Sequence, residues 1–183
     1  MRQSDDGRPG GEPGGDTLRM AREQGQALEH ALRYMTEREA DDGGEKRVGD
    51  FLIGYAVAAA EGMYELRDGR LEWEEPDEEE NAHLAVSVRD AADGRFIPAL
   101  SVHATLIDAQ GTEVGTSRQP YLWHPWLHHY GRNWCVPGDG EYTLRVRVEA
   151  PNFPRHDRTN GRRFQEDAEV EFTGVRIRTG QKR

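Results

Sequence analysis

Short segments that alternate apolar and polar residues recur through the second half of the sequence. The clearest are residues 83–88, 99–107, 142–148 and 168–177. Turn signals such as Asp93-Gly94 and residues 137–140 separate them, at intervals of about 8–12 residues. Because side chains alternate faces along a strand, each segment has one face available for a core. Seven or more such strands predict an all-β fold of the immunoglobulin-like β-sandwich type.

An apolar run at residues 51–60 begins the predicted sandwich, and a hairpin follows it. Residues 63–66 and 71–73 flank the pair Asp68-Gly69, a dipeptide that favours a tight turn between two strands. The acidic stretch 74–80 then predicts a solvated linker. We therefore expect the sandwich to cover residues 50–178 and residues 179–183 to form a basic tail.

The residues before the sandwich divide into two parts. Residues 1–16 are rich in Gly, Pro, Asp and Arg and predict a disordered arm. Residues 17–45 predict a helical extension and a linker, with Asp16 or Thr17 as the helix cap and an end before the breaker at residues 41–44. Its apolar residues recur at roughly helical spacing: Leu18, Ala21, Leu28, Leu32 and Met35.

Charge and hydropathy exclude several classes of function. The net charge of −10 argues against duplex nucleic acid and anionic membranes as partners and favours cations. No stretch approaches the ~20 apolar residues of a spanning helix, so we expect no membrane insertion. The first residues lack the apolar core of a signal peptide, which predicts a cytoplasmic protein, or a periplasmic one if the true start lies upstream.

Enzymatic motifs are missing from the sequence. There is no Gly-x-Ser-x-Gly elbow and no glycine-rich phosphate loop before a helix, and the carboxylates form no recognisable acid–base pair. The single cysteine, Cys135, lies between Trp134 and Val136, which predicts a buried, inert thiol. We therefore predict that the protein is not an enzyme.

Residues 119–131 concentrate histidine and tryptophan. They hold three of the seven histidines and two of the four tryptophans of the chain. If this segment is extended, one face carries His124, Trp126 and His128, and the other carries Trp123, Leu127 and His129. This pattern predicts a buried wall with imidazoles at its rim.

Histidines also occur in other segments of the predicted sandwich. Histidines 83, 124, 128, 129 and 156 come from three separate segments, as the ligands of a tertiary metal site would. Imidazole suits copper, zinc, iron or nickel, whereas the lack of cysteine pairs argues against a zinc knuckle. A lone histidine is more often a hydrogen-bonded surface or core residue, and we expect His103 to be one.

Several motifs together resemble the Fe²⁺-transport-associated periplasmic protein family. They are His83-Leu84, residues 120–122 running into His129-Tyr130-Gly131-Arg132-Asn133, residues 140–144, Arg155-His156, and the closing residues 170–174. Gly62-Met63 resembles an early Gly-Met of that family. The resemblance covers roughly residues 50–178 and implies an immunoglobulin-like, copper- and iron-binding protein that works with an iron permease and is often a homodimer.

The resemblance also implies a ligand set. The family's copper-binding histidines correspond to His83, His129 and His156 in this sequence. The family's Glu after the first His is Ala85 here, and its Met falls near Tyr121 or Leu122, so that His124 is a candidate replacement. Loss of the thioether should weaken Cu(I) binding relative to Cu(II) or Zn(II).

Three functions follow from these observations. The leading one is a non-enzymatic copper-binding β-sandwich, with iron or zinc as alternative metals. Its predicted ligands are His83, His129, His156 and His124, with His128, Met63, Trp123 and Trp126 as secondary metal or interface residues. The alternative is a cytoplasmic interaction or structural module that has lost metal binding and uses its aromatic residues as a hot spot. A carbohydrate-binding face ranks third.

Overall fold

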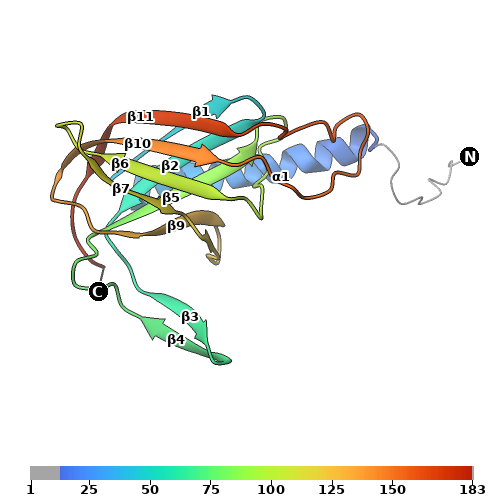
Figure 1. Cartoon of the computed structure of the whole chain (residues 1–183). Helices are drawn as coiled ribbons and strands as arrows, with labels where there is room; N and C mark the ends of the chain where they lie inside the picture. Colours follow the sequence, from blue (N-terminus) through green and yellow to red (C-terminus); the bar gives the residue numbers. More distant parts are fainter. Residues whose placement is uncertain (1–12, 183) are drawn as a thin grey trace, which may run out of the picture.

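Two antiparallel sheets pack face to face in the computed structural model, which describes residues 13–182 (Figure 1). One sheet has the strand order β1-β2-β5-β9-β8 and the other β11-β10-β6-β7. This arrangement confirms the predicted immunoglobulin-like sandwich. The strands of the first sheet are β1 (Asp42–Val48), β2 (Phe51–Ala58), β5 (Ala82–Asp90), β9 (His129–Trp134) and β8 (Tyr121–Leu122), and those of the second are β11 (Ala168–Ile177), β10 (Gly140–Val148), β6 (Val102–Ile107) and β7 (Glu113–Arg118).

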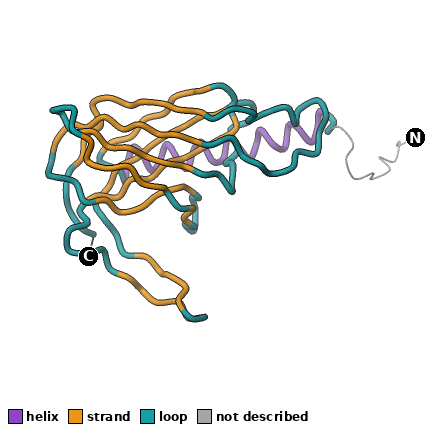
Figure 2. Tube along the Cα trace, viewed as in Figure 1, coloured by secondary structure: helices purple, strands orange, loops and turns teal. Residues whose placement is uncertain are grey.

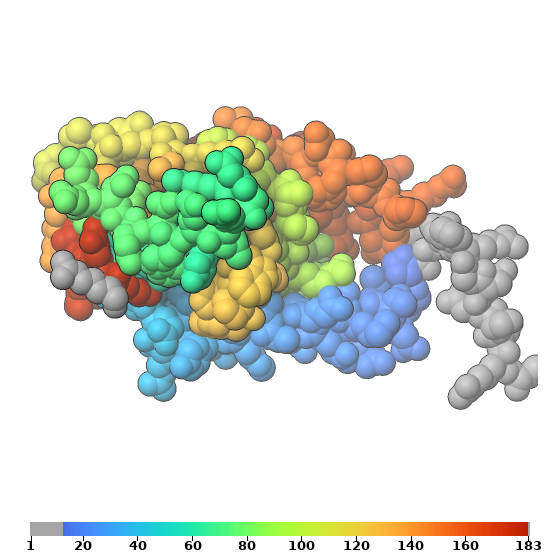
Figure 3. Space-filling view, turned by 90° about the horizontal axis from the view of Figure 1, so that it is seen from below, coloured from blue at the N-terminus to red at the C-terminus, as the bar shows by residue number. Residues whose placement is uncertain are grey.

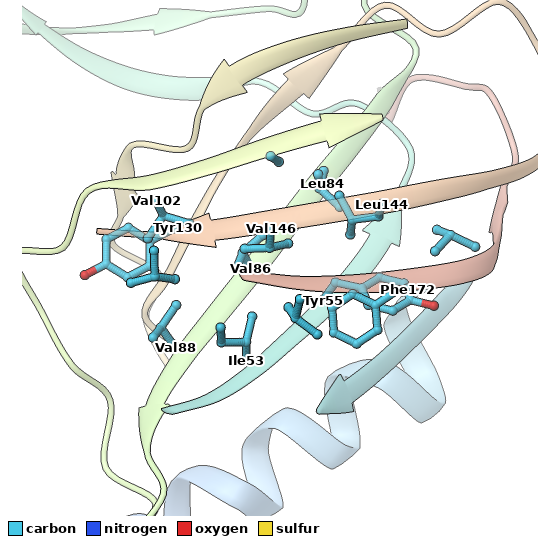
Figure 4. Packing of buried hydrophobic residues seen from close by; sticks show 14 of the residues in the cluster. Ile53, Tyr55, Leu84, Val86, Val88, Val102, Tyr130, Leu144, Val146 and Phe172 are labelled. Carbon is cyan, nitrogen blue, oxygen red and sulfur yellow. The ribbon is translucent and has the colours of Figure 1, made fainter. Parts of the chain in front are cut away.

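Alternating side chains from both sheets form the core between the layers (Figure 4). Val86 of β5 and Val146 of β10 are fully buried there, and each such side chain contributes about 1.5–3 kcal/mol by leaving water. The Tyr130 hydroxyl lies among them, donating to the Ile97 carbonyl (2.7 Å) and accepting from the Leu100 amide (3.1 Å). Its polar atom is therefore satisfied inside the core.

β5 differs from the other strands because all nine of its residues are buried. One of its faces meets the second sheet, and the other carries His83, Ala85 and Ser87 toward the outside of the sandwich. A strand in a two-layer sandwich normally leaves that outer face to water. Something must therefore cover it, and the N-terminal helix does so.

The helix α1 (Gly15–Tyr34) runs along the outer face of the first sheet and continues as a single π-helical turn, η1 (Met35–Glu39) (Figures 1 and 2). Gly25 is buried against the turn after β5, and an added Cβ would lie only 1.7 Å from the Asp93 carbonyl oxygen. The N-cap is Gly14 with no side-chain cap, so the predicted capping by Asp16 or Thr17 is wrong. Instead, the Thr17 hydroxyl donates to the Gly14 carbonyl at 2.8 Å.

Two local predictions are corrected by the structure. The helical segment ends before residues 41–44 as predicted, but the linker predicted up to residue 45 is wrong, because Asp42–Val48 pairs with β2 as an edge strand. Glycine suits that position because the ring of Tyr55 would lie 3.0 Å from a Cβ at Gly44. Cys135 was expected to be buried but is exposed, since it follows the inward-facing Trp134 just after β9.

The predicted hairpin consists of β3 (Met63–Arg67) and β4 (Arg70–Glu74), and it projects from the sandwich (Figure 1). Asp68 and Gly69 both have positive φ, 49° and 78°, as the two central residues of a type I′ turn require. The pairing Tyr64↔Trp73 places two exposed aromatic rings on one face of the hairpin. A small apolar surface is thus left open to solvent.

The remaining domain boundaries are only partly covered by the described residues. Residues 1–12 of the predicted arm and Arg183 of the predicted tail lie outside them. Lys182 lies beside Ala60, donating its amide to the Ala60 carbonyl at 2.7 Å. Within residues 13–182, no helix combines the length and the apolar character needed to cross a bilayer.

Candidate metal centre

His83 lies near the start of β5 on the outer face of the first sheet, and it is 4% exposed. Its neighbours in the strand, Ala82 and Leu84, point to the core instead. His83 pairs across the sheet with Ala58 of β2 and Asn133 of β9. Three strands therefore fix the position of this imidazole.

Asn133 sets which nitrogen of His83 carries the proton. Its amide nitrogen donates to the Glu61 carbonyl (2.9 Å), and its Oδ1 accepts from the Glu61 amide (3.3 Å). The same Oδ1 lies 3.0 Å from His83 Nδ1, so it accepts the Nδ1 proton. Nε2 of His83 is left with a free lone pair, in the arrangement that proteins use to orient a metal-binding histidine.

His129 begins β9 and faces the same side as His83. The two ring centroids are 5.8 Å apart and their planes are nearly perpendicular, at 89°. Gly131 makes room for both rings, because a Cβ there would lie 3.1 Å from His129 Cδ2, 3.1 Å from His83 Nε2 and 2.8 Å from the Leu84 carbonyl oxygen. The sequence His129-Tyr130-Gly131 thus directs the tyrosine into the core and leaves the histidine and the space beside the glycine on the outer face of the strand.

A cavity of about 380 Å³ opens in front of the two imidazoles. The sheet forms its floor, with Ala56, Ala58 and Ala85 as small residues that leave space. Its roof comes from the end of α1, the π-helical turn and the loop after β8, whose atoms lie side by side in Figure 3. The other lining residues are Tyr34, Met35, Glu39, Glu61, His124, Trp126, Leu127 and Lys182.

Burial keeps these imidazoles uncharged. Desolvation lowers the pKa of His83, and the nearby Glu61 carboxylate opposes this shift only in part. Desolvation, with a smaller contribution from His83, also lowers the pKa of His129 to about 4. Both rings are therefore neutral at pH 7, which is the form that coordinates metal ions.

Whether a metal ion fits the cavity depends on which ring nitrogens around it lack a hydrogen-bond partner. Among residues 13–182, the buried side-chain nitrogens with no hydrogen-bond partner include Nε2 of His83, both ring nitrogens of His129 and Nδ1 of His124. Buried polar atoms are normally paired, so unpaired ring nitrogens on the residues of one cavity indicate a missing partner. In the described part of the chain, no three His, Cys, Asp or Glu side chains are already close enough to hold an ion together. Two imidazoles are thus in place, and further donors have to approach them.

The structure separates the other predicted site residues. His124 and Trp126 line the cavity, with their rings 5.4 Å apart. His128 instead lies beside Tyr121, at 5.9 Å between ring centroids, in a different hollow. Trp123 is 70% exposed, and Met63 begins the projecting hairpin.

His156 is exposed on the loop between β10 and β11 and does not line the cavity. That loop is tied to the far end of β5, where Arg163 donates to Asp90 at 2.6 Å. Asp90 is seven residues beyond His83 in the same strand, roughly 23 Å at the rise of an extended chain. The structure therefore does not bring His156 to His83 and His129 within one chain.

The extended conformation predicted for residues 119–131 is wrong for its middle part. β8 contains only Tyr121 and Leu122, and the chain then bends at Pro125 and Trp126 before β9 begins. The bend brings the Leu127 amide to the His124 carbonyl at 3.4 Å. As a result His124 and His129, which were placed on opposite faces, line the same cavity.

Sequence reasoning missed some residues of this site. Asn133 and Gly131 were noted only as part of a motif, although their even spacing from His129 places all three on one face of a strand. Met35 and Glu39 gave no functional signal, because they lie at the end of a helix far away in the sequence.

Comparison with known proteins identifies the family of this chain. A sequence model of the family described as Fe²⁺ transport protein matches residues 70–175, which is more than half of the chain. No curated protein sequence gives a significant match.

Solved structures show the same fold. FetP of uropathogenic Escherichia coli strain F11 superposes with a TM-score of 0.61 at 20% identity, covering 75% of this chain and 94% of its own. Copper-reconstituted P19 of Campylobacter jejuni gives a TM-score of 0.60 at 20% identity, covering 77% of this chain and 96% of its own. A copper-bound variant of FetP gives 0.59 at 18% identity, covering 74% and 90%.

Proposed function

This chain belongs to the Fe²⁺ transport protein family, and from that premise we propose that it binds a copper ion in the cavity at His83 and His129. The observation that carries the proposal is the set of buried ring nitrogens that face this cavity without a hydrogen-bond partner among residues 13–182. Imidazole nitrogen is a good ligand for copper and also for zinc and iron. His124, on the loop that roofs the cavity, is the third proposed ligand.

The comparisons support copper as the first metal to test. Structures of FetP and P19 have been obtained with copper bound, and the family is named for Fe²⁺ transport. We infer a non-enzymatic accessory role in iron or copper uptake, with an iron permease as the partner that receives or supplies the ion. FetP was crystallised after expression in a periplasm, which supports an extracytoplasmic location for this chain as well.

The chemistry of the cavity fits capture and release of an ion. Burial keeps the imidazoles neutral at pH 7, so an arriving cation displaces no proton from them. The net charge of −10 raises the concentration of cations around the protein. Protons compete for the same lone pairs, and acidification therefore releases the ion.

Elemental analysis tests the proposal. Purified untagged protein is equilibrated separately with copper, zinc and ferrous iron, passed through a desalting column and analysed. We expect about one equivalent of copper in the wild type and none in the double variant H83A/H129A. H103A serves as the matched control, because His103 lies in the opposite sheet. No metal retained by the wild type under any condition would refute metal binding.

A second candidate function rests on the exposed aromatic residues. Trp123 on the cavity loop and Tyr64 and Trp73 on the hairpin are open to solvent, and such side chains are enriched in binding hot spots. We propose a protein-interaction surface there if metal binding fails. Wild type and a variant in which Tyr64, Trp73 and Trp123 are replaced by Ala would be compared for partner binding, with the permease as the first partner tested.

A further inference from the structure

Met35 lies where the N-terminal helix meets the proposed copper cavity, and the inference drawn from it rests on the proposed function. It begins the π-helical turn that follows α1. This segment precedes the residues matched by the family model, which begin at residue 70. Met35 therefore lies outside the segment that carries the family match.

The π-helical turn holds Met35 over the cavity. The Ala40 amide donates to the Met35 carbonyl at 3.0 Å and closes the wide turn. The Met35 amide itself reaches the carbonyls of Ala31 and Leu32, and the Thr36 hydroxyl donates to Leu32 at 3.1 Å. π-helical turns are rare and occur frequently at functional sites, because they displace a side chain from its normal helical position.

Met35 also occupies the boundary between two adjoining hollows. It lines the histidine cavity and a second one of about 280 Å³ beneath α1, and so do His129 and Leu127. Its side chain is half-buried, on the side of the helix that faces the sheet. Met35 is therefore partly shielded from bulk water and lines the same cavity as the imidazoles.

The donors around the cavity differ in chemical character. Glu61 is a hard oxygen donor whose carboxylate already pairs with Lys182 at 3.2 Å. A thioether is a soft donor that favours Cu(I), whereas imidazole also accepts Cu(II) and Zn(II). Among the cavity-lining residues, Met35 is the one that carries sulfur.

We propose that Met35 is a ligand that makes the site selective for cuprous ion, supplied by a helical lid that closes over the histidines. The two imidazoles of the sheet bind the ion first, and the π-helical turn then brings the thioether toward it. This order agrees with the observation that, within the described residues, no three His, Cys, Asp or Glu side chains are grouped closely enough to hold an ion. The alternative interpretation is that Met35 has a packing role only, because methionine often fills irregular spaces in protein cores.

The substitution M35L separates the two readings, because leucine keeps the apolar volume and removes the sulfur. Every variant, and the parent protein with which it is compared, carries C135S, because the exposed Cys135 thiol is another soft donor. M20L is the matched control: Met20 is exposed on the same helix. Affinities for Cu(I), Cu(II) and Zn(II) are measured by competition with chromophoric chelators, and circular dichroism checks that each variant is folded.

We expect M35L to bind Cu(I) about tenfold or more weakly than C135S alone and to keep its Cu(II) and Zn(II) affinities within about twofold. X-ray absorption of the Cu(I) form should show a copper–sulfur contribution that M35L lacks and M20L keeps. Unchanged Cu(I) affinity, or an equal loss for all three ions, would overturn the ligand role of Met35. A parent protein that binds copper without any sulfur contribution would do the same. If the parent binds no metal, the proposed function itself fails.

Discussion

The His83 and His129 rings lie 5.8 Å apart and nearly at right angles, and Gly131, which has no side chain, leaves room for both. The two residues are far apart in the sequence, and the antiparallel pairing of β5 with β9 brings them together. Because both rings are buried and neutral, the pair can offer lone pairs to a cation without first losing protons.

We predict that H83A and H129A each lower copper affinity by at least tenfold, and that the double variant loses binding. Each removes one of the imidazoles whose nitrogens face the cavity. Competition titration with a chromophoric chelator measures the effect, and H103A should match the wild type. Full affinity in the double variant would remove this pair from the site.

Asn133 is predicted to act through His83. In N133A the Nδ1 proton of His83 loses its acceptor, and the ring is free to turn or change tautomer. Loss of such an orienting partner typically costs 10–100-fold in metal affinity. The ¹⁵N chemical shifts of the His83 ring check the tautomer directly. An unchanged Nδ1–H tautomer in N133A would contradict this reading.

Gly131 is predicted to tolerate no side chain. The Cβ in G131A would lie 2.8 Å from the Leu84 carbonyl oxygen, a backbone atom that can move little. We expect G131A to reduce the free energy of unfolding by about 1–3 kcal/mol, as overpacking does. It should also weaken copper binding by displacing His83. Urea unfolding measures the first effect, and G140A, at a site with only an ordinary ring contact at 3.7 Å, is the control.

Stability should depend on pH through the same histidines. The pKa of His129 is about 4 in the folded protein and near 6.5 in the unfolded chain, and that of His83 is lowered in the same direction. Below about pH 6.5, these two histidines therefore bind more protons in the unfolded chain than in the folded protein. Their stabilising effect is complete above pH 6.5 and is lost as the pH falls toward 4. Urea unfolding of the metal-free protein between pH 7 and 4.5 should show this loss, and H129L should show a smaller one.

His156 gives a prediction about the number of chains at the site. Its loop is anchored to the opposite end of β5, so H156A should leave copper affinity unchanged in a monomeric protein. Affinity is measured together with the oligomeric state by analytical ultracentrifugation. If H156A loses copper, the imidazole must come from a second copy of the chain, as the family resemblance allows.

The sandwich was predictable because its strands repeat a period-two pattern with turn residues between them. Asp68-Gly69 illustrates this, since the dipeptide alone specifies the tight turn that the structure contains. β1 was not predictable in the same way, because Gly43 and Gly44 are typical of a helix end followed by a linker. Only the neighbouring rings and side chains explain why glycine is needed in that strand.

The candidate site was predictable in its residue types but not in its geometry. His83 and His129 stood out by their motifs, whereas a bend at Pro125 decided which way His124 points. Met35 had no marker at all, since a methionine at the end of an amphipathic helix normally packs. Contacts between residues so distant in sequence depend on tertiary structure, which local patterns do not encode.

The order of the chain has a consequence for its synthesis. The lid, residues 15–39, leaves the ribosome before the surface that it covers is complete, because that surface includes β9 at residues 129–134. The helix therefore cannot pack on the sheet until more than half of the protein has been synthesised after it. Copper capture of the kind proposed is then restricted to finished chains, and a truncated product would carry the helix without its cavity.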